Sequence, residues 1–469
     1  MQPGDLLDLD VTDVAHGGVF VARHEGRVVF VEGAIPGERV RAELTDTAKA
    51  AFWRADVVDV LDASAHRRPH VWAAADVSVP PAERPGGADF GHLDLDEQRV
   101  LKKRVLDDAL TRFGGVSEPE TTISPAGDAG GRGDAGDADS SGAEASDGLR
   151  WRTRVSLHVD EEGRIGPFAA RSHRVIETPD LPLATAEIEE VARSLEGFAP
   201  GRVDLVQPDE GGVRVIVRPE QPRPEGSERA ERADAPRGRG ARAGRGARSR
   251  RPAPRVPRAP EDPTARETVI ERVGDRRFLV DAGGFWQVHR LAAATLTGAV
   301  RRALETVGGV DPAAQHLDLY GGVGLFAAAI AEAGGAGTRV TSVESDARAT
   351  EHAGENLAEW VGARAETARA DRYLASLSAQ AGAAERARLA RGVVLLDPPR
   401  AGAGREVVDR IAGLAPASIV YVACDPVALA RDLGTFRGHG YEPLRIDAFD
   451  LFPHSHHVEA VAMLARTSG

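Results

Sequence analysis

In the C-terminal half of the chain, four short apolar runs each carry a chemically useful residue at or near their end. These residues are Asp318, Glu344, Asp397 and Cys424, and segments with helical spacing separate the runs. Strands that alternate with helices are typical of a doubly wound, Rossmann-like parallel sheet. Because the carboxyl ends of parallel strands meet at one edge of the sheet, we expect the four side chains to surround one site.

A glycine-rich turn follows the first of these runs. Gly321, Gly322 and Gly324 let the backbone approach a ligand, and Glu344 after the next strand can accept hydrogen bonds from ribose hydroxyls. Glycines at these positions also allow a strand to pack tightly on a helix. The turn alone therefore does not distinguish a cofactor site from tight packing. Apolar residues follow where a dinucleotide site would have a third glycine, which favours S-adenosylmethionine over a pyrophosphate cofactor.

Cys424 is the only cysteine among the 469 residues. Asp425 is a suitable N-cap for the helix that follows, and Pro426 suits its first turn. A helix N-terminus stabilises a thiolate and lowers its pKa, so we expect Cys424 to be a nucleophile; a buried structural cysteine is the alternative. Glu459 precedes an apolar run, where partial burial would raise its pKa and suit a general base.

Composition restricts the partners and the location of the chain. It has no run of about 18 apolar residues and no basic-then-apolar start, so we expect neither a membrane span nor a secretory signal, and a cytoplasmic location. One cysteine excludes a disulfide within the chain and a cysteine-ligated zinc or iron–sulfur site. The net charge of −13 argues mildly against nucleic acid, but residues 236–258 hold nine arginines and no acid.

The pattern of apolar and polar residues divides the chain into three parts. Residues 1–62 alternate in short strands and predict a small barrel; residues 63–265 predict a central α+β subdomain; residues 266–469 hold the α/β domain. Two low-complexity inserts, at about 125–149 and 219–263, interrupt the central part. Helical spacing predicts helices over Glu97–Phe113 and Val288–Val307.

Three histidines near the C-terminus raise the question of a metal. His454, His456 and His457 lie close to Glu459. On a strand, His456 and His457 would point to opposite faces, and no second acidic cluster is near. We therefore expect no metal site.

Taken together, the motifs resemble those of the RNA uracil-C5 (m5U) methyltransferase family, and residues 1–62 resemble the TRAM domain, a small RNA-binding barrel. The segments that carry the resemblance, in the family's order, are Gly284-Phe285-Trp286-Gln287-Val288, Asp318-Leu319-Tyr320, Glu344, residues 396–400, residues 421–426 with 429–433, and residues 452–459. The set is far more specific than any one motif.

The resemblance implies a mechanism and a site. Cys424 would add to C6 of a uridine in RNA, S-adenosyl-L-methionine would methylate C5, and Glu459 would remove the C5 proton. The implied cofactor-binding residues are Gln287, Tyr320, Glu344 and Asp397, with Asp371 as a further candidate. We favour ribosomal RNA over transfer RNA, and a monomer.

The chain also departs from the family pattern. Several relatives hold a [4Fe–4S] cluster through four cysteines, whereas Ala88 stands at one of these ligand positions, so we expect no cluster. Asp425 stands where many relatives have Asn, and an ionised Asp425 would oppose formation of the Cys424 thiolate. The alternatives are a methyltransferase for another base and a non-catalytic RNA-binding factor.

Overall fold

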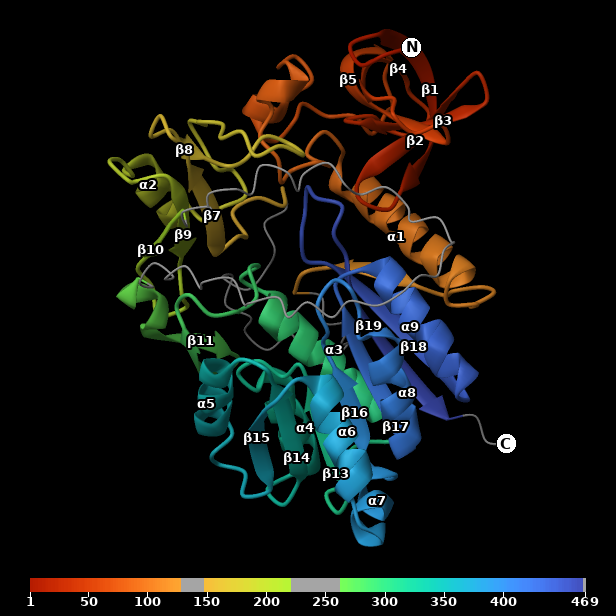
Figure 1. Ribbon diagram of the computed structural model, residues 1–469, viewed down its shortest axis with the longest axis vertical. Helices are drawn as coiled ribbons and strands as arrows, with labels where there is room; N and C mark the ends of the chain where they lie inside the picture. The colour runs from red at the N-terminus through yellow and green to blue at the C-terminus, as the bar shows by residue number, and fades with distance from the viewer. Residues whose placement is uncertain (128–146, 221–261, 467–469) are drawn as a thin grey trace, which may run out of the picture.

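The computed structural model describes residues 1–127, 147–220 and 262–466 (Figure 1). The arginine-rich run at 236–258 and most of both low-complexity inserts lie outside the described residues. The described chain forms a closed β-barrel, a four-stranded sheet, a two-stranded hairpin and an eight-stranded sheet. The expected architecture, a small barrel before a Rossmann-like α/β domain, is confirmed. Within the described residues, no helix is both long enough and apolar enough to span a membrane.

The barrel forms because its strands alternate buried and exposed side chains. Leu7, Leu9 and Val11 on the first strand are buried, while the residues between them face solvent. The strand order is β1-β2-β3-β5-β4. The strands are β1 (Leu6–Ala15), β2 (Val19–His24), β3 (Arg27–Glu32), β4 (Arg39–Asp46) and β5 (Phe52–Asp62).

A small antiparallel sheet forms the central part, in the order β10-β9-β7-β8, with one helix beside it. A hairpin then leads into the α/β part. These elements are β7 (Arg154–Val159), β8 (Ile165–Gly166), α2 (Ala186–Arg193), β9 (Gly201–Val206), β10 (Arg214–Pro219), β11 (Thr268–Val273) and β12 (Arg276–Asp281).

The eight-stranded sheet has the order β15-β14-β13-β16-β17-β19-β18-β6. Strands β13 to β17 run parallel, and β19 runs antiparallel to β17. The strands are β13 (Gln315–Leu319), β14 (Arg339–Glu344), β15 (Ala363–Thr367), β16 (Val393–Leu396), β17 (Ser418–Ala423), β18 (Tyr441–Asp450), β19 (Glu459–Arg466) and β6 (Thr122–Pro125).

Helices cover both faces of this sheet, which is why its central strands are apolar throughout. Val393 and Leu395 of β16 face a core formed with α3 and α4, while Val394 and Leu396 face a core formed with α1, α6, α8 and α9. The helices are α1 (Leu95–Arg112), α3 (Ala292–Thr306), α4 (Leu325–Gly334), α5 (Ala347–Asn356), α6 (Ala370–Gln380), α7 (Ala383–Leu389), α8 (Gly404–Leu414) and α9 (Pro426–Gly438).

Two elements from the first third of the chain pack against or pair with the C-terminal part. Helix α1 packs against α9, and β6 pairs in parallel with β18 at the edge of the sheet (Figure 1). The expected helix over Glu97–Phe113 is confirmed but begins at Leu95, because Asp94 accepts a hydrogen bond from the Glu97 N–H at 2.9 Å and caps it. The domain limits 1–62, 63–265 and 266–469 remain predictions.

A buried ion pair fixes α1 to the end of β18. The side chains of Lys102 and Asp450 are both fully buried and in contact, and the Lys102 ammonium also donates to the carbonyl of Phe452 at 3.0 Å. One turn earlier, the side-chain Oε1 of Gln98 accepts from the N–H of His454 at 2.7 Å. Helix α1 therefore holds the loop that leads into Glu459.

Lys102→Met is expected to destabilise the protein by about 3 kcal/mol or more, because it leaves the Asp450 carboxylate buried without its ammonium. Urea unfolding followed by tryptophan fluorescence measures the effect. Lys103→Met is the matched control, since Lys103 is half exposed and pairs with Asp107 one turn along the same helix. We expect it to change stability by less than about 0.5 kcal/mol. Equal unfolding midpoints for the two variants would contradict the role of the buried pair.

Candidate active site

One cavity of about 1300 Å³ lies at the carboxyl ends of the parallel strands. All the side chains that the sequence singled out for catalysis or cofactor binding line it, and these are Gln287, Tyr320, Glu344, Asp371, Asp397, Cys424 and Glu459. The convergence follows from topology, because each strand of a doubly wound sheet delivers its last residues to the same edge.

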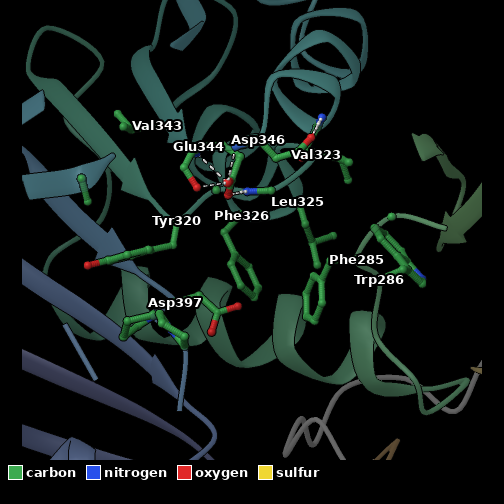
Figure 2. A pocket seen from close by; sticks show the side chains of 18 of the residues that line it. Phe285, Trp286, Tyr320, Val323, Leu325, Phe326, Val343, Glu344, Asp346 and Asp397 are labelled. Atoms are coloured by element: carbon green, nitrogen blue, oxygen red, sulfur yellow. Dashed lines mark hydrogen bonds between the residues drawn. The ribbon is translucent and has the colours of Figure 1, made fainter. Parts of the chain in front are cut away.

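The turn after β13 forms one wall of the cavity. Tyr320 has a φ of 63°, Gly322 a φ of 53° and Gly324 a φ of 88°, so the backbone passes through the left-handed region three times. A side chain at Gly321 would collide with Ser342 and Asp318. The strained Tyr320 therefore presents its ring to the cavity, and the glycines keep the turn flat against the sheet (Figure 2).

Glu344 is held rigidly beside this turn. Its carboxylate accepts hydrogen bonds from the N–H of Gly322 at 3.2 Å and of Asp346 at 2.9 Å, as Figure 2 shows. These bonds fix the carboxylate at the end of β14, where a ligand's hydroxyl groups can reach it. Phe326 and Phe285 lie nearby in the same view, and Phe285 is 75% exposed, so an apolar surface is open to a ligand.

Asp371 lies at the rim of the cavity. It is the second residue of α6, and Arg369 donates to it at 3.0 Å. The hydrogen bond from Arg369 is the main reason that the pKa of Asp371 is lowered. Asp371 is therefore a fixed anion at the edge, less enclosed than Glu344.

Two carboxyl groups near the ends of the central strands differ in their position. Asp397 lines the cavity, and burial raises its pKa to about 7. The expectation that Asp318 would also face the site is wrong, because Asp318 is fully buried and is not among the residues that line the cavity. Its Oδ2 accepts from the N–H of Ala327 at 3.0 Å and so anchors the start of α4, and burial raises its pKa to about 8.

Cys424 and Glu459 come from adjacent antiparallel strands. Ala423 of β17 pairs with Ala460 of β19, so the next residues along, Cys424 and Glu459, oppose each other just beyond the ladder. Both line the cavity. The register brings together two residues that are 35 positions apart in the sequence.

The prediction of a lowered pKa at Cys424 is wrong. Burial, together with the carboxyl groups of Glu459 and Asp397, raises the pKa of the thiol to about 12, although Arg400 acts in the opposite direction. The N-terminus of α9 is present, but Asp425 already accepts from the N–H groups of Val427 at 3.0 Å and Ala428 at 2.8 Å. The Asp425 cap thus already takes up the free N–H groups at the start of α9, so few of them can stabilise the Cys424 thiolate.

Glu459 has the raised pKa that the sequence predicted. Its side chain is buried, and burial is the main cause, with a further contribution from Asp397 and an opposing one from Arg400. A buried carboxyl group that faces a thiol can exchange a proton with a bound ligand without competition from water.

Gln287 reaches the cavity from a loop, and not from just before a helix as expected. The predicted helix start at Val288 is wrong, because the carbonyl of Val288 accepts from both the N–H and the hydroxyl of Thr153, at 2.8 and 3.1 Å. Helix α3 begins only at Ala292. The loop before it therefore joins the central part of the chain to the cavity wall.

Sequence reasoning missed Arg152 and Phe452, which also line the cavity. The Nε of Arg152 is buried and has no hydrogen-bond partner within the described residues. Burial, and repulsion from Arg400, lower the pKa of Arg152. The only sequence signal was its place in the run Leu149-Arg150-Trp151-Arg152, beside two further polar or aromatic residues.

The histidine-rich segment is a loop and not a strand, which corrects the expected geometry. The rings of His456 and His457 lie 4.1 Å apart on the same side, and His456 contacts Asp89 at 2.7 Å. The Nε2 of His457 lies 3.4 Å from Arg400. Across residues 1–127, 147–220 and 262–466, no cluster of three or more His, Cys, Asp or Glu side chains is arranged for a metal.

Comparison with known families agrees with this geometry. Residues 312–467 match the model of the tRNA (uracil-5-)-methyltransferase family, and residues 2–58 match the TRAM domain. A crystal structure of Pyrococcus abyssi tRNA (uracil-54, C5)-methyltransferase with S-adenosyl-L-homocysteine shares the fold, with a TM-score of 0.59 and 21% identity over 98% of this chain and all of that one.

Curated relatives match over nearly the whole length. A Streptomyces avermitilis protein named an uncharacterized RNA methyltransferase is 37% identical, covering 98% of each chain. The Halomonas elongata 23S rRNA (uracil(1939)-C(5))-methyltransferase RlmD is 30% identical, covering 97% of this chain and 89% of that one. The chain therefore belongs to the RNA (uracil-5-)-methyltransferase family and carries the TRAM domain at its N-terminus.

Proposed function

We propose that this protein methylates C5 of a uridine in RNA through a covalent bond between Cys424 and C6 of the base. The observation that carries the proposal is the opposition of Cys424 and Glu459 at the ends of β17 and β19, inside the cavity that Glu344 also lines. The chemistry requires a nucleophile that reaches C6 and a base that reaches the proton on the adjacent C5 of the same uracil.

The residues present fit S-adenosyl-L-methionine. Gly321 lets the turn lie directly against Asp318 and Ser342, which holds the turn beside Glu344, and the fixed Glu344 carboxylate can accept from ribose hydroxyls. Gln287, Tyr320 and Asp397 complete this side of the cavity, with Asp371 at its rim. When bound there, S-adenosyl-L-methionine supplies the methyl group that C5 accepts.

The chain's own residues carry the remaining steps. The Cys424 thiolate adds to C6, and the electron pair of the C5–C6 double bond moves toward C5 and O4. After C5 has gained its methyl group, Glu459 takes the C5 proton. The electrons of that C–H bond re-form the double bond and expel the Cys424 thiolate, so the nucleophile is restored.

The raised pKa of Cys424 makes loss of its proton the demanding step. Arg400 lowers that pKa, and within the cavity the buried cation Arg152 lies close enough to repel Arg400. We infer that these two arginines and Phe452 support the flipped base and favour negative charge on it, because a base cannot be reached within a helical stack.

We propose RNA as the partner, with ribosomal RNA favoured over transfer RNA. The support is the RlmD relative, whose name specifies 23S rRNA and which covers the chain at 30% identity. Cytoplasmic location and a monomeric state remain part of the proposal. The two alternatives are a methyltransferase for another base and a non-catalytic binding factor. The methylated nucleosides measured in the next experiment distinguish both from the proposed activity.

Cys424→Ala is expected to abolish methylation, by at least about 10³-fold, because no other thiol exists in the chain. Nucleoside mass spectrometry of unmodified tRNA and rRNA fractions, each incubated with S-adenosyl-L-methionine, measures 5-methyluridine. RNA binding by the variant should remain within about twofold of wild type. Formation of 5-methyluridine by Cys424→Ala, or of 5-methylcytidine by the wild type, would contradict the proposal.

Glu459→Gln is expected to trap the covalent intermediate. Without the carboxylate, the C5 proton stays in place and the thiolate cannot leave, so a methylated RNA–protein adduct accumulates while turnover falls by at least about 100-fold. Denaturing gel electrophoresis with labelled RNA detects the adduct. The double variant Cys424→Ala/Glu459→Gln is the control and should form none. Unimpaired turnover would remove Glu459 from the mechanism.

Glu344→Gln is expected to weaken binding of S-adenosyl-L-methionine about tenfold, since hydrogen bonds to a charged acceptor are worth roughly 1.5–3 kcal/mol. Isothermal titration calorimetry without RNA gives the dissociation constant. Glu366→Gln is the matched control, because Glu366 lies near the end of the neighbouring strand β15 and is exposed outside the cavity. Equal affinity in both variants would exclude Glu344 from the cofactor site.

A further inference from the structure

One histidine of the barrel contacts the residue that follows Cys424. His16, in the turn between β1 and β2, contacts Asp425 with its Nε2 2.8 Å from the carboxylate Oδ2. Asp425 directly follows Cys424. A residue from the first strand pair of the chain thus touches the loop that holds the only thiol, 409 positions later.

Both oxygens of Asp425 are occupied. Oδ1 accepts from the N–H groups of Val427 and Ala428, and Oδ2 faces His16. Burial alone would raise the pKa of Asp425, but the hydrogen bonds from His16 and the two N–H groups outweigh burial and lower it. Asp425 is therefore an anion beside Cys424, and His16 is its only side-chain partner among the described residues.

The turn that carries His16 is itself fixed. A side chain at Gly18 would collide with Asp89 and His456, so the turn lies directly against both. Arg104 of α1 also bonds Asp13 of β1 at 3.1 Å. The close contact at Gly18 sets the position of His16 over Asp425, whereas the Arg104–Asp13 pair is a separate, exposed contact between the barrel and α1.

A small pocket of about 140 Å³ lies at this junction, lined by His16, Cys424 and Asp425. The other charged or titratable groups that line it are Lys102, Arg400, His456 and His457. The hydrogen bond to Asp425 raises the pKa of His16, although burial and the nearby Arg431 act against it. Among these groups, His16 is the one that bonds the Asp425 carboxylate directly.

We propose that His16 is a positioning residue for the reaction: it binds the Asp425 carboxylate, keeps its charge and its lone pairs directed away from Cys424, and so allows the thiolate to form. The inference rests on the proposed role of Cys424 as nucleophile. It concerns only the acid next to Cys424, since burial, Glu459 and Asp397 are what raise the pKa of the thiol.

A double-mutant cycle on the single thiol tests the proposal without RNA or cofactor. The alkylation rate of Cys424 by iodoacetamide at pH 8 is measured for wild type, Asp425→Asn, His16→Ala and the double variant. His16→Ala and the double variant open the same space and differ by one charge. We expect His16→Ala to react about threefold more slowly than the double variant, equivalent to roughly half a unit in thiol pKa.

Asp425→Asn should react within about twofold of wild type, because His16 already compensates the carboxylate. Arg104→Ala is the matched control: it removes another ion pair between barrel and body without touching Asp425, and we expect no change in rate. Equal rates for His16→Ala and the double variant, or the same loss in Arg104→Ala, would overturn the proposal.

The methylation assay gives the second readout. His16→Ala should lower kcat by about threefold or more with an unchanged KM for RNA, and the added Asp425→Asn should restore kcat. A rise in KM alone would assign His16 to RNA binding and overturn the proposal. If wild type forms no 5-methyluridine while the alkylation cycle behaves as expected, the proposed function fails and the electrostatic role of His16 stands.

Discussion

The buried contact between Lys102 and Asp450 determines how the active site is assembled. It joins a helix from the first quarter of the chain to the end of β18, and the same ammonium holds the carbonyl of Phe452. The loop after Phe452 carries the histidines that meet the barrel and ends at Glu459. This buried pair holds the loop that leads into Glu459, together with Arg99, which lies 3.5 Å from the same carboxylate, and with the hydrogen bond between Gln98 and His454.

The α/β part and most of the site could be predicted from the sequence because both rest on local patterns. Apolar runs of strand length and their terminal residues are adjacent in the chain, and parallel strands bring those ends together without further information. Glu344, Asp397 and Cys424 were found in this way. The sequence placed Glu459 at the start of a buried strand, but its position opposite Cys424 depends on the antiparallel register of β19 against β17, which the sequence did not indicate.

What could not be predicted depends on contacts between distant segments. Nothing in the residues around Thr122 indicates that they form the edge of a sheet whose other strands begin after residue 314. Arg152 and His16 are ordinary polar residues until the fold brings Arg152 to the cavity and His16 to the small pocket beside Cys424. The pKa of Cys424 was misjudged for the same reason: the helix end is visible in the sequence, whereas the burial and the two facing carboxyl groups are not.

The parallel pairing of β6 with β18 has a consequence for how the chain is made. Strand β6 is made early, whereas β18, the strand with which it pairs, is synthesised roughly tens of seconds later at ordinary elongation rates. Helix α1 must likewise wait for α9. The barrel can close as soon as β5 has emerged, whereas the eight-stranded sheet cannot form before β18 and β19 have been made. The nascent protein therefore exposes the face of α1 that packs on α9 until α9 has been synthesised.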